Sequence, residues 1–159
     1  MLVLTVIMQW LHVILGITWF GSNIYTNVVV IPAVGRLSVE EQQQIGRLLG
    51  PATAKVMTPV SIGVVLIGFL RGTFFGNVHS LEYLFGSAYG ITWFISLLLG
   101  IALILWGALV VGPRAEALNT AKTREEFSKV FSELKVVAPL EILGFLAIFT
   151  CMILMRFGY

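Results

Sequence analysis

Residues 89–112 read YGITWFISLLLGIALILWGALVVG and contain no charged side chain. A helix needs about 20 mainly apolar residues to cross about 30 Å of hydrocarbon, because it rises about 1.5 Å per residue. Three further stretches meet this requirement, at 4–33, 56–72 and 137–157. The sequence therefore predicts an all-α membrane protein, in which a bundle of four transmembrane helices forms one domain over residues 1–159.

The composition excludes a water-soluble fold. Hydrophobic residues make up 58% of the 159-residue chain and charged residues only 11%, whereas an average soluble domain is about 25% charged. The formal net charge of +2 is small and dispersed, so the expected partner is a lipid bilayer and not nucleic acid. Residues 1–20 contain no Lys or Arg, and we therefore expect a retained first span rather than a cleavable signal peptide.

Two connections between the predicted spans begin with the S/T-x-x-E pattern of a capping box, at Ser38–Glu41 and Thr123–Glu126. This pattern starts a helix, so we expect two amphipathic helices at one membrane face. Lys and Arg are concentrated in these two connections and are absent from 73–88. Because positively charged loops stay inside, the amphipathic helices are predicted to be cytoplasmic and both termini to lie outside the cell membrane.

Short motifs recur in the same order in the two halves of the chain. Gly16-Ile-Thr-Trp-Phe20 returns as Gly90-Ile-Thr-Trp-Phe94, and Lys55-Val-Met-Thr-Pro59 returns as Lys135-Val-Val-Ala-Pro139. The capping box recurs between them. We expect two tandem helix-pair repeats, at about 4–72 and 88–157, of the parallel kind because the first and third spans run in the same direction.

A histidine inside the first span is the main candidate for a functional site. Ionisable side chains at membrane depth are functional-site hypotheses by default, and His12, Gly16, Trp19 and Asn23 share one helix face. The glycine leaves room for a flat group, the indole supplies an apolar wall, and a neutral imidazole can ligate iron. The pattern indicates haem b with His12 as axial ligand. The simpler alternative is that His12 only bonds a carbonyl or hydroxyl of a neighbouring helix.

The stretch Trp10–Tyr25 resembles the first helix of the family that includes HemJ-type protoporphyrinogen oxidases and CopD-like copper-resistance membrane proteins. That helix carries L-H-x6-W-F/V-G/A, and here Leu11 and His12 precede Trp19-Phe20-Gly21 at the same spacing. The resemblance implies a small helical bundle that binds b-type haem or porphyrin through His12. The chain lacks a match to the intramembrane lysine of HemJ-type enzymes, since Lys55 and Lys135 stand at helix starts.

Further residues are candidates for the remaining contacts of a haem. His79, in the outer connection, is a candidate second metal ligand, and Met152 and Met155 offer a thioether instead. Iron without a second ligand would keep an open position for oxygen, nitric oxide or carbon monoxide. Arg71 ends the second span and is placed to pair with a haem propionate, because a guanidinium binds a carboxylate in a bidentate manner.

The first functional hypothesis is an integral membrane haem b protein that exchanges electrons with a redox partner or binds a diatomic gas, with oxidoreductase activity left open. The second is a copper-handling protein of CopD type, in which Met8, His12, Cys151 and Met155 form a soft Cu(I) site. HemJ-like porphyrinogen oxidation and a structural bundle without a cofactor are further alternatives. Phosphate-binding loops, HEXXH and GxSxG are absent from the sequence, which removes support for nucleotide-driven transport and hydrolysis.

Glu141 is a second ionisable residue in a span, two residues after Pro139, where it either takes up a proton or bonds a carbonyl that the proline frees. From its depth we expect it to lie more than about 15 Å from His12 along the membrane normal.

The G-x-x-x-G pairs Gly68/Gly72 and Gly86/Gly90 favour close helix packing within the chain or in a homodimer.

Overall fold

In a computed structural model that describes residues 2–159, the chain is all-α and includes four helical rods that are long and apolar enough to cross a membrane. The first rod is made of α1 (Leu2–Tyr25), η1 (Thr26–Val30) and α2 (Ile31–Val34), and the second is α3 (Val39–Thr73). The third joins α5 (Ala88–Trp106), η2 (Gly107–Val111) and α6 (Gly112–Thr120), and the fourth is α7 (Arg124–Arg156). The short α4 (Leu81–Gly86) precedes α5.

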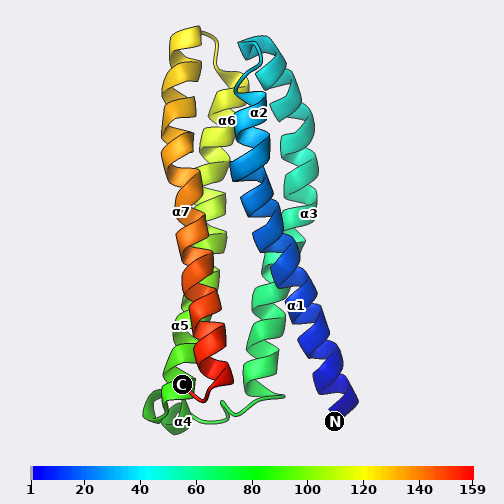
Figure 1. The fold of residues 1–159 in the computed structure, drawn as a ribbon, viewed down its shortest axis with the longest axis vertical. Helices are drawn as coiled ribbons and strands as arrows, with labels where there is room; N and C mark the ends of the chain where they lie inside the picture. Colours follow the sequence, from blue (N-terminus) through cyan, green and yellow to red (C-terminus); the bar gives the residue numbers. More distant parts are fainter. Residues whose placement is uncertain (1) are drawn as a thin grey trace.

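The rods lie side by side, with both termini and α4 at one end and the α2–α3 and α6–α7 connections at the other (Figure 1). We call these the terminal end and the basic end, because most of the Lys and Arg residues lie in the connections at the latter or on the helices that lead into them. Helix α1 packs mainly on α3, and α5 packs mainly on α7. Smaller contacts of α3 with α5 and α6, and of α1 with α7, join the two pairs into a bundle.

Apolar side chains cover the outside of the rods. Ile17 is 65% exposed, Leu109 69% and Leu143 62%, exposures that would be costly in water and cost nothing in lipid. The prediction of four long apolar helices is thus confirmed over residues 2–159, and such an arrangement is that of a multi-pass membrane protein.

Both capping boxes start helices as predicted. The Ser38 hydroxyl accepts from the Glu41 backbone N–H while the Glu41 carboxylate accepts from the Ser38 N–H, and the Thr123 hydroxyl accepts from the Glu126 N–H. The helices that follow differ from the expected separate amphipathic helices. With 35 and 33 residues, α3 and α7 run without a break into the spans and extend past the ~30 Å hydrocarbon thickness.

Two π-helical turns interrupt the first and third rods, and no sequence pattern predicted them. Thr26–Val30 stands just before Pro32, and Gly107–Val111 just before Pro113. Proline has no N–H to donate to the preceding turn, and at both places the hydrogen bonding widens: the Ile31 N–H bonds the Thr26 oxygen and the Gly112 N–H bonds the Gly107 oxygen. The first and third rods thus each contain one π turn, at matching places near the basic end of the bundle.

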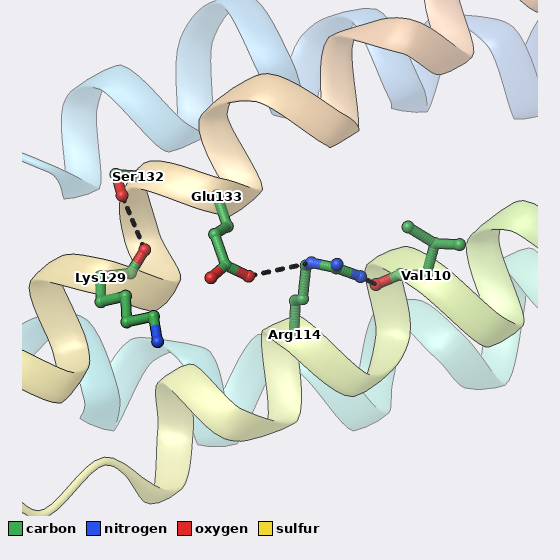
Figure 2. Close-up of polar contacts among 5 residues, drawn as sticks. All are labelled: Val110, Arg114, Lys129, Ser132 and Glu133. Carbon is green, nitrogen blue, oxygen red and sulfur yellow. Dashed lines mark hydrogen bonds and ion pairs between the residues drawn. The ribbon is translucent and has the colours of Figure 1, made fainter.

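Polar contacts at the basic end hold the connections in place. The Arg114 Nε lies 3.3 Å from a Glu133 carboxylate oxygen, and its Nη1 donates to the Val110 carbonyl at 2.9 Å (Figure 2). Arg114 therefore joins the third rod to α7 and also supplies a donor to a π-turn carbonyl. The Gln43 amide donates to the Ala121 carbonyl at 2.9 Å, which ties α3 to the end of α6.

Candidate functional site

A cavity of about 560 Å³ lies between the four rods in the half of the bundle nearest the terminal end. Its size is within the roughly 300–1,000 Å³ of small-molecule and cofactor sites. Most of its wall is apolar or aromatic. All four rods contribute, through Gln9, His12, Val13, Gly16, Ile17 and Trp19, then Val64, Val65, Gly68, Arg71 and Gly72, then Tyr89, Trp93, Ser96, Leu97 and Gly100, and finally Phe145, Ile148, Phe149, Met152, Met155 and Arg156.

The imidazole of His12 is held by one hydrogen bond across the α1–α3 contact. Its Nδ1 lies 3.0 Å from the Val64 carbonyl oxygen, which can only accept, so Nδ1 carries the proton in this bond. Within residues 2–159, Nε2 has no hydrogen-bond partner. In the neutral ring Nε2 then holds the lone pair, and this is the arrangement found in many metal-ligating histidines, whose other nitrogen donates to a carbonyl.

Gly68 makes the space that this imidazole occupies. A Cβ atom at Gly68 would lie 2.9 Å from His12 Cε1 and 3.3 Å from His12 Nδ1, closer than ordinary van der Waals contact. At Gly16, by contrast, a Cβ would meet Val64 Cγ2 at an ordinary 3.7 Å. The sequence pointed to Gly16 as the residue that makes room, and the structure adds Gly68, which the sequence suggested only for helix packing. The role of Gly68 depends on the register of α3 against α1, which the sequence of one helix does not contain.

Aromatic rings close the cavity toward the middle of the bundle. Trp19 and Phe145 meet edge to face with their ring centroids 4.9 Å apart, and Phe149 packs edge to face on Phe20 at 4.7 Å. Trp19, Phe145 and Phe149 all line the cavity. They form its floor, and they separate it from the polar residues farther along α1 and α7.

Positive charge gathers at the other limit of the cavity. Arg71, one turn after Gly68 on α3, and Arg156, at the end of α7, both line it near the terminal end. The lining residues that the structure describes include no Asp or Glu, and neither arginine takes part in an ion pair within residues 2–159. An apolar chamber with two guanidinium groups at one end suits a ligand that has a flat apolar body and an anionic edge.

Four of the residues predicted for the site therefore share one cavity: His12, Gly16, Trp19 and Arg71. Asn23 is not among the lining residues, because its amide donates instead to the Glu141 carboxylate. His79 is exposed in the connection between α3 and α4 and also lies outside the lining set.

The residues proposed for copper are divided. His12 and Met155 line the cavity, whereas Met8 and the buried Cys151 are not in its lining. Met152, named as a possible thioether ligand, does line it. Within residues 2–159 there is no group of three or more His, Cys, Asp or Glu residues placed to hold a metal ion.

Comparison of the chain with protein-family models, with curated proteins and with solved structures finds no significant match.

The His12–Val64 bond and its dependence on Gly68 can be tested by ¹⁵N NMR of histidine-labelled protein in detergent. We expect His12 to show a protonated Nδ1 and an unprotonated Nε2, with the two histidines assigned by His79→Ala. Gly68→Ala should disturb this signal because its Cβ meets the ring, whereas Gly50→Ala on the same helix should not, since a Cβ there meets only an Asn119 side-chain atom at 3.9 Å. A proton on Nε2 in the unchanged protein would contradict the geometry.

Proposed function

We propose that the protein binds a b-type haem in this cavity, with Nε2 of His12 as an axial ligand to iron. The observation that carries the proposal is the hydrogen bond from Nδ1 to the Val64 carbonyl, which fixes the tautomer and leaves Nε2 without a partner among the described residues. A haem supplies reversible one-electron chemistry or, with an open position, binding of a diatomic gas. The residues of this chain would hold it, exclude water and set its orientation.

The donor set and the lining of the cavity fit such a group. An imidazole nitrogen, apolar and aromatic walls and two guanidinium groups at one end match the iron, the macrocycle and the two propionates of a haem. For the second axial position, Met152 and Met155 line the cavity and the exposed His79 does not. This favours a thioether or an open coordination position over a bis-histidine site.

The alternatives receive less support from the same residues. The proposed copper set needs Met8 and Cys151, which are outside the cavity lining. HemJ-type enzymes use an intramembrane lysine for porphyrinogen oxidation, and no lysine is among the cavity-lining residues that the structure describes. Electron transfer or gas binding therefore remains the favoured role of the site.

The proposal also covers the placement of the chain in the membrane. We propose that the basic end faces the cytoplasm, because most of the Lys and Arg residues lie toward it, and that the α1–α3 and α5–α7 pairs are parallel repeats. The matching π turns of the first and third rods support the second point.

The orientation is checked by cysteine labelling in intact cells. In a Cys151→Ser background, Tyr159→Cys should react with a membrane-impermeant maleimide added outside, whereas Ser128→Cys, on the exposed part of α7 at the basic end, should react only after the membrane is opened. The reverse pattern would place the basic end outside.

Haem binding is checked by titrating hemin into the detergent-purified protein and recording oxidised-minus-reduced spectra. The unchanged protein and His79→Ala should give a b-type spectrum. His12→Ala should lose the b-type spectrum, because the truncation removes the proposed iron ligand. We expect the affinity of this variant for hemin to be at least about tenfold lower. A protein that gives no Soret shift with hemin would overturn the haem proposal, and retention of Cu(I) by that protein would then favour the copper alternative.

The arginine contribution is checked by comparing hemin with hemin dimethyl ester, whose propionates carry no charge. Arg71→Gln should weaken hemin binding by about tenfold, since a hydrogen bond between charged groups contributes about 1.5–3 kcal/mol. The same variant should leave binding of the ester nearly unchanged. The control is Arg47→Gln, because the Arg47 side chain bonds the Asn119 backbone oxygen at the basic end; this variant should change the binding of neither ligand. Equal loss for both ligands would show that Arg71 acts through packing and not through the propionate.

A further inference from the structure

A second polar group lies one helical turn beyond the cavity floor, toward the basic end. Asn23 is four residues after Trp19 on α1, and Glu141 is four residues before Phe145 on α7. The Trp19–Phe145 ring contact and the bond between the Asn23 amide and the Glu141 carboxylate are thus successive contacts along the same pair of helices. The proposed haem site uses neither Asn23 nor Glu141.

The orientation of the Asn23 amide is set by Asn27. The Asn27 Nδ2 donates to the Asn23 backbone oxygen at 2.9 Å and to the Asn23 Oδ1 at 3.3 Å. Because Oδ1 receives this donor, Asn23 presents its own N–H group to the Glu141 Oε2. A donor aimed at a carboxyl oxygen favours the ionised form of the acid.

The other carboxyl oxygen lies on the side of the third rod. A Cβ built on Gly107, the first residue of the η2 turn, would lie 3.5 Å from the Glu141 Oε1, so this oxygen lies close to the backbone of a glycine. No hydrogen bond reaches Oε1 within residues 2–159. Among the described residues the carboxylate therefore has one amide donor and no ion-pair partner. A single donor offsets only part of the cost of removing a charged group from water into an apolar span.

Arg114 of α6 and Lys135 of α7 are engaged in other interactions than with this carboxyl. Arg114 of α6 pairs with Glu133, as Figure 2 shows, and Lys135 stacks over the Phe131 ring at 4.5 Å. η2 has no titratable side chain, and α5 has only Tyr89, which lines the cavity. On α1, Tyr25 is exposed and His12 bonds Val64. On α7, Cys151 is buried at the level of the cavity, on the other side of the cavity floor from Glu141.

From this geometry we propose that Glu141 is an exchangeable proton-binding site, in which Asn23 stabilises the ionised carboxylate and Oε1 takes up the proton from the side of Gly107. One amide donor favours the charged form, and the apolar surroundings favour the neutral form. The balance between them lets the group gain and lose a proton. The inference is independent of the ligand of the cavity, so it stands or falls separately from the haem proposal.

The test is pH-dependent infrared spectroscopy of the detergent-purified full chain without added hemin, from about pH 4 to about pH 10, a range that covers ordinary and raised carboxyl pKa values. We expect a protonated-carboxyl band that disappears as the pH rises, shifts in D₂O and is missing in Glu141→Gln. The matched control Glu133→Gln, which removes the acid paired with Arg114, should keep the band. Identical spectra of the unchanged protein and Glu141→Gln at every pH would overturn the proposal.

The part assigned to Asn23 is tested with Asn23→Ala. Loss of the amide donor should make proton binding at Glu141 about tenfold tighter, moving the midpoint of the band to higher pH, because a hydrogen bond to a charged group contributes about 1.5–3 kcal/mol. An unchanged midpoint would contradict the role given to Asn23.

A measurement on the unchanged protein avoids dependence on the folding of any variant. Dicyclohexylcarbodiimide, an apolar reagent that reacts with protonated carboxyl groups, should label Glu141 at low pH and progressively less at high pH, as read by peptide mass mapping. Labelling of Glu141 that is absent, or that does not change with pH, would overturn the proposal.

Discussion

Backbone hydrogen bonding in an apolar environment constrains every other feature of this bundle. Within hydrocarbon, water cannot replace a lost N–H···O bond, so a chain crosses as uninterrupted helices. Where proline removes a donor, before Pro32 and Pro113, the structure responds with π turns, and an arginine side chain donates to the Val110 carbonyl of one of them. Gly107, the first residue of one widened turn, lies opposite Glu141, so the π turn and the polar site adjoin each other in the bundle.

The His12–Val64 bond joins two explanations that the sequence presented as alternatives. A histidine in a helical bundle often does no more than bond a neighbouring backbone oxygen, and His12 does make that bond. The same bond orients the ring, fixes its tautomer and leaves Nε2 free of partners within the described chain. A structural role for Nδ1 and a ligand role for Nε2 are therefore compatible in one side chain, and the haem proposal rests on the second nitrogen.

The α1–α7 contact organises the interior into two zones. Trp19 and Phe145 separate a chamber with arginines at one end from a small polar group formed by Asn23, Asn27 and Glu141. The chamber offers volume, aromatic walls and positive charge, which suit a bulky anionic cofactor. The polar group offers one carboxyl and amide donors, which suit a proton. Aromatic packing between them keeps the two environments apart although they share two helices.

The sequence by itself determined the four long apolar helices and the helix starts at Ser38 and Thr123, because hydrophobic length and capping are local properties of the chain. It also placed His12, Gly16 and Trp19 on one face, since helical periodicity fixes which residues of one helix lie together. Only the tertiary structure decided that Val64 and Gly68 meet the imidazole, that Arg71 joins the same cavity while His79 stays outside it, and that Asn23 turns to Glu141. Those facts depend on the register and rotation of one helix against another, and many weak packing contacts distributed over both helices set them, which no single stretch of sequence contains.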